Sequence, residues 1–205
     1  MDIKKLNHEL GNADLILIDQ ILKNRFHKEM RILDAGCGEG RNMVFFVRNN
    51  YLIFGIDQDP EAVKLARIFC GSLNRDYDVE NIQCFPIEDN PFPDGFFDVV
   101  ICINVLHDAR NRLAFLNMFN QLIRLLNSGG FLLLSMESKI GIPERSDMKI
   151  YEEEGTKNQI ANFYFSEELA REIFSKDLWT KIEPVKTMLF DDTKSFSYLL
   201  IKKKV

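Results

Sequence analysis

The chain has 205 residues, of which 46% are hydrophobic and 28% are charged, so it can bury a sizeable core and is not disordered in composition. Its formal net charge of -5 disfavours RNA or DNA as the main partner, because a phosphate backbone attracts a surplus of positive charge. The sequence has no internal repeat or low-complexity linker, and we expect a single domain over residues 1–205.

The first twenty residues and the cysteines both bear on where the protein works. MDIKKLNHELGNADLILIDQ interrupts its apolar residues with acids, which is not typical of a secretory signal. No apolar run approaches the roughly 18 residues that span a bilayer. Cys37, Cys70, Cys84 and Cys102 form no C-x-x-C pair, and no acidic cluster has the spacing of a metal site. We therefore expect a reduced, cytoplasmic protein with no membrane partner and no metal.

The N-terminal part predicts a helical cap followed by two strands. Apolar residues recur at helical spacing within residues 1–29 and are interrupted only by Gly11. A strand is expected over residues 31–35, and it leads into a glycine-rich turn with a short helix after it. The second strand, residues 51–56, ends in Asp57.

The next helix has an unusually clear start at Asp59. Aspartate is a favoured capping residue, and Pro60 stands where its missing N–H costs nothing. Glu61 adds a carboxylate to the first turn, where the helix dipole favours it. Apolar residues then continue at helical spacing, at Ala62, Leu65, Ala66 and Phe69.

Strands and helices continue to alternate through the middle of the chain. Residues 81–85 predict a short strand, and residues 97–105 predict a buried one because they are almost continuously apolar. A helical stripe over residues 113–126 stops at Asn-Ser-Gly-Gly, and residues 131–136 predict another buried strand. This alternation is typical of a parallel sheet with helices on both faces.

The C-terminal part predicts an antiparallel addition to that sheet. Ser166 begins a helix, and two strands follow it, at residues 181–190 and 195–201, joined by a short turn. Strands joined so closely must be antiparallel. We therefore predict an α/β fold with a mixed seven-stranded sheet, helices on both faces and a C-terminal antiparallel hairpin.

The stretch ILDAGCGEGRN, residues 32–42, places three glycines at the end of the first strand, where open α/β sheets bind ligands. A phosphate-binding P-loop would need a Gly-Lys-Ser/Thr ending, which is missing here. A dinucleotide fold would need a third glycine at the position of Arg41. Glycines that only allow a tight turn remain an alternative.

Asp57 indicates which kind of ligand could bind beside the glycine turn. It ends the second strand 21 residues after Gly36, where a carboxylate can accept hydrogen bonds from both ribose hydroxyls of a nucleoside. A ribose-binding acid without a phosphate cradle indicates a nucleoside that lacks phosphates. S-adenosylmethionine is a ligand of that kind, and its methionyl portion can lie close to a glycine backbone.

Four stretches, in this order, resemble successive motifs of the class I S-adenosylmethionine-dependent methyltransferases: ILDAGCGEGRN, FGIDQDPEAVKLAR, EDNPFPDGFFDVVICINVLHD and NSGGFLLLSM. The resemblance covers residues 30–138 closely. It implies a Rossmann-like fold, S-adenosyl-L-methionine as cofactor, and methyl transfer to a small-molecule acceptor by direct displacement. The Gly40-Arg41-Asn42 triplet is also similar to the tellurite-resistance and thiopurine branches of the family.

The resemblance also implies roles for individual residues. The methionyl portion would lie over the glycines, with Asp34 orienting its amino group, and the adenine would lie beside Gln58. The family often has an aspartate after the third strand that binds the adenine amine, but Pro86 stands there, so either Glu88 substitutes for it or the adenine contact is weaker. The implied cofactor-binding set is Asp34, Gly36, Gly38, Gly40, Asn42, Asp57, Gln58, Ile87, Glu88 and Asn104.

Three questions stay open in the sequence. His107 and Asp108 are candidate catalytic residues, as a general base or an acceptor-orienting pair, but a helix cap and a surface histidine explain them equally well. Residues 139–165 are either a substrate lid, closing with the N-terminal cap over the acceptor, or a solvated loop. The alternatives to an enzyme are a non-catalytic S-adenosylmethionine-binding regulator or subunit and, less favoured, a nicotinamide-dependent oxidoreductase.

Overall fold

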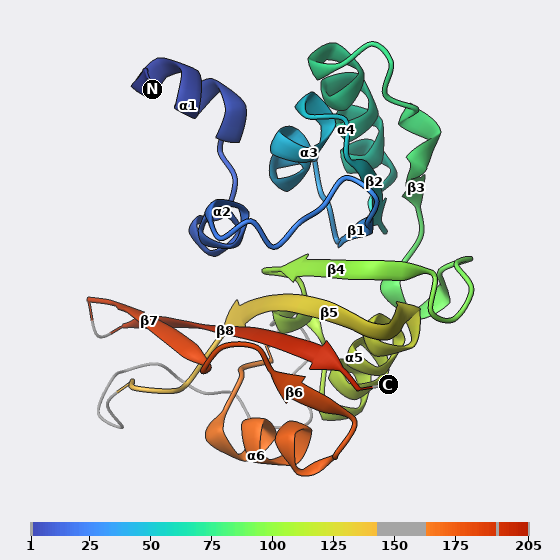
Figure 1. The fold of residues 1–205 in the computed structure, drawn as a ribbon. Helices are drawn as coiled ribbons and strands as arrows, with labels where there is room; N and C mark the ends of the chain where they lie inside the picture. The colour runs from blue at the N-terminus through green and yellow to red at the C-terminus, as the bar shows by residue number, and fades with distance from the viewer. Residues whose placement is uncertain (1, 143–162, 192, 205) are drawn as a thin grey trace.

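The chain forms one mixed β-sheet with helices packed on both of its faces (Figure 1). The structure is a computed structural model that describes residues 2–142, 163–191 and 193–204. The strand order is β3-β2-β1-β4-β5-β8-β6, and β7 also pairs with β8. The strands are β1 (Arg31–Ala35), β2 (Leu52–Asp57), β3 (Ile82–Cys84), β4 (Phe97–Ile103), β5 (Leu126–Glu137), β6 (Trp179–Lys181), β7 (Lys186–Phe190) and β8 (Lys194–Lys203).

The strands β1 to β5 are parallel to one another, whereas β8 runs antiparallel to β5. Parallel strands point their carboxyl ends to one edge, so the segments that follow β1, β2, β3 and β4 gather there. The reversal of strand order falls between β1 and β4, because β2 and β3 lie on one side of β1 and β4 on the other. This is the expected place for a ligand in an open α/β sheet.

The helices divide between the two faces of the sheet. Buried side chains of α2 (Leu15–Leu22), α3 (Val44–Arg48) and α4 (Pro60–Leu73) share one core with one face, and α5 (Arg112–Leu125) and α6 (Glu167–Ser175) cover the other. The remaining helix, α1 (Ile3–Leu10), contacts α3. Four short 3-10 turns complete the described elements: η1 (Arg41–Met43), η2 (Val79–Asn81), η3 (Ile87–Asp89) and η4 (Leu106–Asp108).

The helix starts that the capping residues predict are confirmed. The Asp59 carboxylate accepts a hydrogen bond from the Glu61 amide at the start of α4, with Pro60 as the first helical residue. The Ser166 hydroxyl accepts one from Leu169 at the start of α6. Such a cap stabilises a helix because it satisfies an amide that has no partner within the helix.

The predicted N-terminal helix is divided in two. Gly11 follows α1 with φ +60, a conformation that suits glycine, and α2 begins at Leu15. A Cβ at Gly11 would lie 3.0 Å from the Val44 side chain, so the break also lets the chain pass close to α3. Within the described residues, no helix combines the length and the apolarity needed to cross a bilayer.

The prediction of a single strand over residues 181–190 is wrong. That segment forms β6 and β7, which are separated by residues 182–185. Pro184 lies in the gap and has no N–H to donate to a neighbouring strand. Both pieces pair with β8, so they occupy one edge of the sheet, which therefore has seven positions and eight strands. The strand predicted over residues 131–136 begins earlier, since Leu126 already pairs with Phe97.

The segment predicted as a lid, residues 139–165, lies mostly outside the described residues, which stop at 142 and resume at 163. Its two ends lie together. Ser138 and Phe165 form an isolated β-bridge, and the Lys139 amide donates a hydrogen bond to the Phe165 carbonyl. The Phe163 amide donates to the carbonyl of His107 at 2.7 Å, so the returning end is fixed beside the segment that follows β4.

Candidate cofactor and active site

A cavity of about 620 Å³ opens at the carboxyl ends of the parallel strands. This volume is in the range of small-molecule sites. Its walls come from the segments after β1, β2, β3 and β4 and from the first turns of α5. The lining residues are Gly36, Gly38, Asp57, Gln58, Phe85, Pro86, Ile87, Glu88, Asn104, Val105, Asp108, Ala109, Arg110, Ala114 and Met118.

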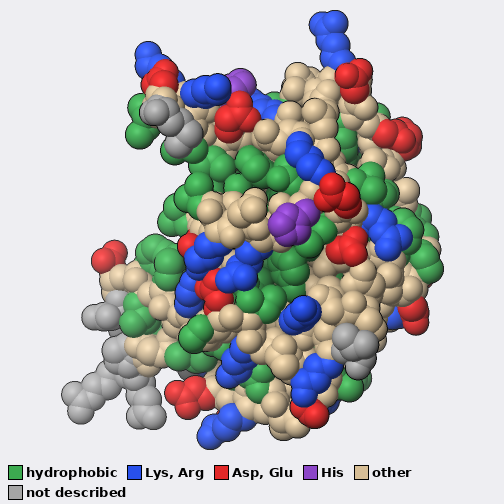
Figure 2. Space-filling model, viewed as in Figure 1, with side chains coloured by type: hydrophobic (Ala, Val, Ile, Leu, Met, Phe, Trp, Pro, Cys, Tyr) green, Lys and Arg blue, Asp and Glu red, His purple; other side chains and the backbone are tan. Residues whose placement is uncertain are grey.

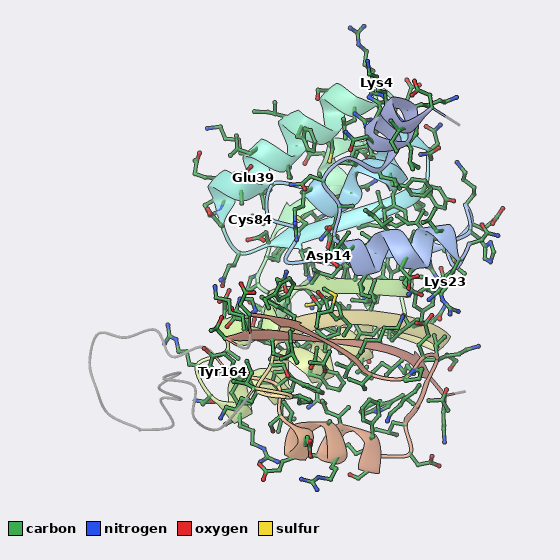
Figure 3. The ribbon with its side chains drawn as sticks, turned by 90° about the vertical axis from the view of Figure 1, so that its left-hand side faces the viewer. Lys4, Asp14, Lys23, Glu39, Cys84 and Tyr164 are labelled. Atoms are coloured by element: carbon green, nitrogen blue, oxygen red, sulfur yellow. The ribbon has the colours of Figure 1, made fainter. Side chains whose placement is uncertain are left out.

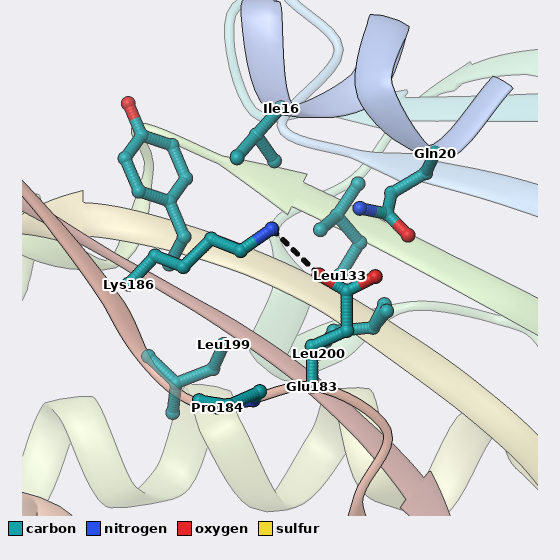
Figure 4. Close-up of a pocket in the computed structure, with 9 residues that line it drawn as sticks. Ile16, Gln20, Leu133, Glu183, Pro184, Lys186, Leu199 and Leu200 are labelled. Carbon is teal, nitrogen blue, oxygen red and sulfur yellow. Dashed lines mark hydrogen bonds and ion pairs between the residues drawn. The ribbon is translucent and has the colours of Figure 1, made fainter. Parts of the chain in front are cut away.

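A second depression lies between α2 and strands β5 and β8 (Figure 4). Its volume of about 10 Å³ holds a single water molecule at most. Glu183 and Lys186 form an ion pair at 2.6 Å on its wall. The larger cavity at the strand ends is therefore the candidate site.

The three glycines of the turn do different things. A Cβ at Gly36, where φ is +77, would lie 2.3 Å from Val105 Cγ2, so only glycine lets this loop pass the end of β4. At Gly38, where φ is +51, a Cβ would meet no atom within 4 Å, because this residue faces the open cavity. At Gly40 a Cβ would lie 3.3 Å from Cys70 Sγ on α4. Gly40 differs from the expectation, since the packing of α4 accounts for it and it is not on the cavity wall.

Asp57 is held in place on the cavity wall by two backbone amides. Its Oδ2 accepts a hydrogen bond from the Gly38 amide at 2.8 Å, and its Oδ1 accepts one from the Asp59 amide at 2.9 Å. The carboxylate thus joins the end of β2 to the glycine turn. Each oxygen keeps a lone pair for a further donor, as a ribose diol would supply.

Asp34 is buried beneath the glycine turn, at 1% exposure, and does not line the cavity. Its Oδ2 has no hydrogen-bond partner among the described residues. Burial raises the pKa of Asp34 to about 7, with the Arg41 charge lowering it and the Asp57 charge raising it further. An unpaired buried carboxyl is costly, and it fits a ligand that brings a cationic amino group.

Asn104 carries the cavity wall at the end of β4. Its φ of +59 is unusual for a residue other than glycine, although asparagine tolerates this conformation best. Two bonds hold it: its amide donates to the Ser135 carbonyl at 2.9 Å, and its Oδ1 accepts from the Ser135 hydroxyl at 3.2 Å. The strand end therefore presents a fixed backbone to the cavity.

The segment after β3 forms a further wall of the cavity, next to α5. Ile87 is buried in η3, whereas Glu88 is exposed, as is Gln58 at the end of the neighbouring strand β2. Pro86 also lines the cavity but offers no side-chain acceptor. The carboxylate of Glu88 is thus on the wall where the family aspartate is missing.

Asn42 is placed differently from the expectation. It is 6% exposed, is not on the cavity wall, and its Oδ1 accepts a hydrogen bond from the backbone amide of Asp14 at 3.0 Å. Asp14 in turn caps α2, since its carboxylate accepts from the Ile16 amide. Asn42 therefore fastens the N-terminal end of α2 to the turn after β1.

His107 and Asp108 lie in η4, directly after β4. Asp108 lines the cavity, but His107 does not. The His107 Nε2 atom lies 3.7 Å from Asp108 Oδ1, and its Nδ1 is buried without a hydrogen-bond partner among the described residues. Buried side-chain atoms without a partner are found only at Asp34 and His107 in the described part of the chain, and both are next to the site.

Several wall residues were not predicted from the sequence. Val105 and Arg110 follow β4, and Ala114 and Met118 lie one turn apart on α5. Helical spacing could have placed the last two on one face of their helix, but it could not show what that face meets.

The described residues next to the glycine turn offer neither a reactive thiol at Cys37 nor a metal site. Cys37, within the glycine turn, is 5% exposed, and burial raises the pKa of its thiol well above the usual range, which keeps it protonated. Among the described residues, no group of three His, Cys, Asp or Glu side chains is arranged to hold a metal ion.

The sheet order, the glycine turn after β1 and the fixed carboxylate at the end of β2 define a nucleoside-binding α/β protein of the class I methyltransferase type. Known proteins agree. A family model described as a methyltransferase domain matches residues 33–134. A ubiquinone biosynthesis O-methyltransferase from Xanthomonas campestris is 34% identical over 107 residues, which are 51% of this chain and 42% of that relative. The match thus spans less than half of the relative's length.

Solved structures show the same fold. A methyltransferase from Methanosarcina mazei, described as SAM-dependent, aligns with a TM-score of 0.68 and 20% identity over 90% of this chain and 97% of its own. Magnesium protoporphyrin IX methyltransferase from Synechocystis, solved with bound SAM, aligns with a TM-score of 0.67 and 17% identity over 96% and 80% of the two chains. The chain belongs to the class I S-adenosylmethionine-dependent methyltransferases. The predicted fold class is confirmed.

Proposed function

We propose that this protein transfers a methyl group from S-adenosylmethionine to a small-molecule acceptor. The observation that carries the proposal is the Asp57 carboxylate, held on the wall of the large cavity by the Gly38 and Asp59 amides. A carboxylate fixed in this way is arranged to accept hydrogen bonds from both ribose hydroxyls. The open space over Gly38 and the unpaired Asp34 carboxyl suit the methionyl portion of the same ligand.

The cofactor, when bound, supplies an activated methyl group on a good leaving group. The residues of this chain then have to align the acceptor with that group and exclude water. Asp57 and Asp34 hold the two ends of the cofactor, and Asn104 fixes the wall between them. A strong base is not required for every acceptor, because the need depends on the acceptor's own pKa.

We infer a small acceptor rather than a nucleic acid. The net charge is -5, and the face in Figure 2 mixes acidic and basic side chains. The relatives named O-methyltransferases make hydroxyl acceptors the first class to test.

The test is a screen of phenols, thiols, amines and carboxylates that measures the demethylated product, S-adenosylhomocysteine. We expect turnover in at least one class, and none by the Asp57→Ala variant at the same cofactor concentration. If the protein binds S-adenosylmethionine but methylates none of these acceptors, the non-catalytic regulator would be favoured. Binding of NAD in place of S-adenosylhomocysteine would favour the oxidoreductase, and activity only on RNA or protein would contradict a small acceptor.

We propose His107 as the general base for acceptors that must lose a proton. His107→Gln is then expected to lower kcat about 100-fold for a phenol, because a positioned base contributes about that much or more. A thiol, which is partly ionised at pH 8, should lose much less. The measurement compares both acceptors at saturating cofactor, with His27→Gln as a control at a histidine away from the site. Equal losses for phenol and thiol would contradict the role as a base.

We propose that Asp34 pairs with the amino group of the cofactor, and this gives a dependence on pH. Because its pKa is about 7 before the ligand binds, Asp34 must lose a proton to pair. The affinity for S-adenosylhomocysteine should therefore rise about 25-fold from pH 5.5 to pH 7.5, below the pH at which an α-amino group itself is neutralised. Calorimetry across this range checks it.

Asp34→Asn is the control, and its affinity should be lower and almost independent of pH. The ligand-free protein gives a second readout. Its folded state keeps a proton between pH 3.8 and about 7 that the unfolded chain has released, so stability should fall as pH rises through that window. Asp34→Asn should remove this part of the slope. An identical pH dependence of affinity in both proteins would contradict the proposed pairing.

A further inference from the structure

The Arg41-Asn42 pair is the part of the glycine motif that the cavity does not explain. Asn42 is bonded to the Asp14 amide, as described above. Arg41 begins η1 immediately after Gly40, and its side chain is 48% exposed. Figure 3 shows Asp14 at the N-terminal end of α2 and Lys23 at its other end. Because Asn42 accepts a hydrogen bond from Asp14, the N-terminal end of α2 lies beside the glycine turn.

Arg41 is only weakly engaged within the protein. Its Nη2 lies 4.0 Å from Asp14 Oδ2, at the limit of an ion pair, and this is its only ion pair among the described residues. None of those residues accepts a hydrogen bond from its guanidinium. In contrast, Arg25 on the same face of the sheet binds Glu183 at 2.7 Å and Gln20 at 2.6 Å. Most of the five donors of Arg41 are thus available to a ligand.

The charges around Arg41 define what that ligand must carry. Asp57 lies on the cavity wall and Asp34 is buried beneath the turn, and the ionised carboxylate of each creates a negative potential in this region. The charge of Arg41 is felt inside this region, because it is the cation that lowers the pKa of Asp34. A ligand with an ammonium and a carboxylate on one carbon would be attracted at its ammonium and repelled at its carboxylate, unless a cation faced the second group.

We propose that Arg41 binds the carboxylate of the methionyl portion, while Asp34 faces its ammonium. This inference rests on the proposed function, because it assumes S-adenosylmethionine as the ligand. A guanidinium suits a carboxylate, since its fork of donors matches the two oxygens. On binding, the Arg41 side chain exchanges the long contact with Asp14 for the ligand carboxylate. Asp14 keeps its place meanwhile, because the Asn42 side chain and the Ile16 amide hold it.

Two ligands separate this inference from the proposed function. S-adenosylhomocysteine carries the amino-acid end, and 5′-methylthioadenosine has the same nucleoside and sulfur without it. We expect Arg41→Ala to bind S-adenosylhomocysteine about tenfold more weakly in calorimetry and to bind 5′-methylthioadenosine within twofold of the wild type. Arg41→Lys should recover part of the loss, because it restores the charge without the fork.

Two matched variants exclude an indirect effect through α2. Asp14→Asn keeps a capping side chain but removes the charge that competes for Arg41, so its affinity for S-adenosylhomocysteine should stay the same or rise. Arg48→Ala removes the other arginine of the 41–48 segment and should change neither affinity.

Each other outcome has a defined meaning. Unchanged binding of S-adenosylhomocysteine by Arg41→Ala would overturn the inference and leave the proposed function intact. Equal losses for both ligands would also overturn it, because Arg41 would then only shape the turn. A wild type that binds neither ligand would overturn the proposed function and the inference together.

Discussion

Replacement of Asp57 by alanine is expected to reduce the affinity for S-adenosylhomocysteine at least about 100-fold. The ribose hydroxyls would lose their acceptor and with it two charge-assisted hydrogen bonds, each of which contributes about 1.5–3 kcal/mol. The variant would also release the Gly38 amide, which Asp57 holds at 2.8 Å, and with it the open part of the glycine turn. Calorimetry with S-adenosylhomocysteine measures the effect directly.

Asp59→Ala is the matched control for this experiment. Asp59 lies two residues further on and caps α4 through the Glu61 amide, but it does not line the cavity. Its loss should lower the free energy of unfolding by about 1 kcal/mol and leave the affinity within twofold. A thermal melt of each variant checks that it is folded. If Asp57→Ala is unfolded, Asp57→Asn replaces it in the binding experiment. Normal binding by Asp57→Ala would show that the ribose assignment is wrong.

Gly36→Ala is expected to lower the free energy of unfolding by about 2–5 kcal/mol. The residue has φ +77, which costs an L-residue about 1–2 kcal/mol, and the new methyl group would lie 2.3 Å from Val105 Cγ2. Overpacking of this kind adds about 1–3 kcal/mol. Urea denaturation measures the loss. The double variant Gly36→Ala/Val105→Ala should regain most of the stability that the clash costs, because the two atoms nearest the new methyl group are the Val105 γ-methyl carbons.

Gly38→Ala is the contrasting variant in the same turn. Its φ of +51 costs about 1–2 kcal/mol, but no atom lies within 4 Å of the added methyl group. The protein should therefore stay folded, and the methyl group should obstruct the ligand and weaken binding about tenfold. Equal stability losses in Gly36→Ala and Gly38→Ala would contradict the different environments of the two glycines.

Local sequence signals predicted most of the fold because the forces that make them are local. Apolar periodicity follows which face of an element is buried, and Asp59 and Ser166 cap helices through amides two or three residues away. The strands at the C-terminal edge of the sheet were harder to predict, since the periodicity of residues 181–190 does not show that the edge strand is interrupted between β6 and β7.

The site residues also include some whose position was predicted from the sequence and some whose position was not. Asp57 and Gly38 were both predicted to bind the cofactor, and the structure joins them by a hydrogen bond because the parallel strands β1 and β2 end side by side. Gly40 and Asn42 belong to the same motif, yet their contacts are with α4 and with Asp14. Sequence spacing alone cannot distinguish a residue that faces a cavity from one that faces a packed helix a few residues later.

The sequence by itself determined the class of fold, and it predicted the edge of the sheet where the cavity lies and the acid, Asp57, that ends β2 on its wall. These follow from burial patterns and from parallel strands ending at one edge. Only the tertiary structure decided which glycines line the cavity, that Asp34 Oδ2 is buried without a hydrogen-bond partner among the described residues, and that the Arg41-Asn42 pair meets the N-terminal end of α2. The reason is physical, because those contacts join segments up to 69 residues apart, such as Gly36 and Val105, whose approach depends on how complete elements pack.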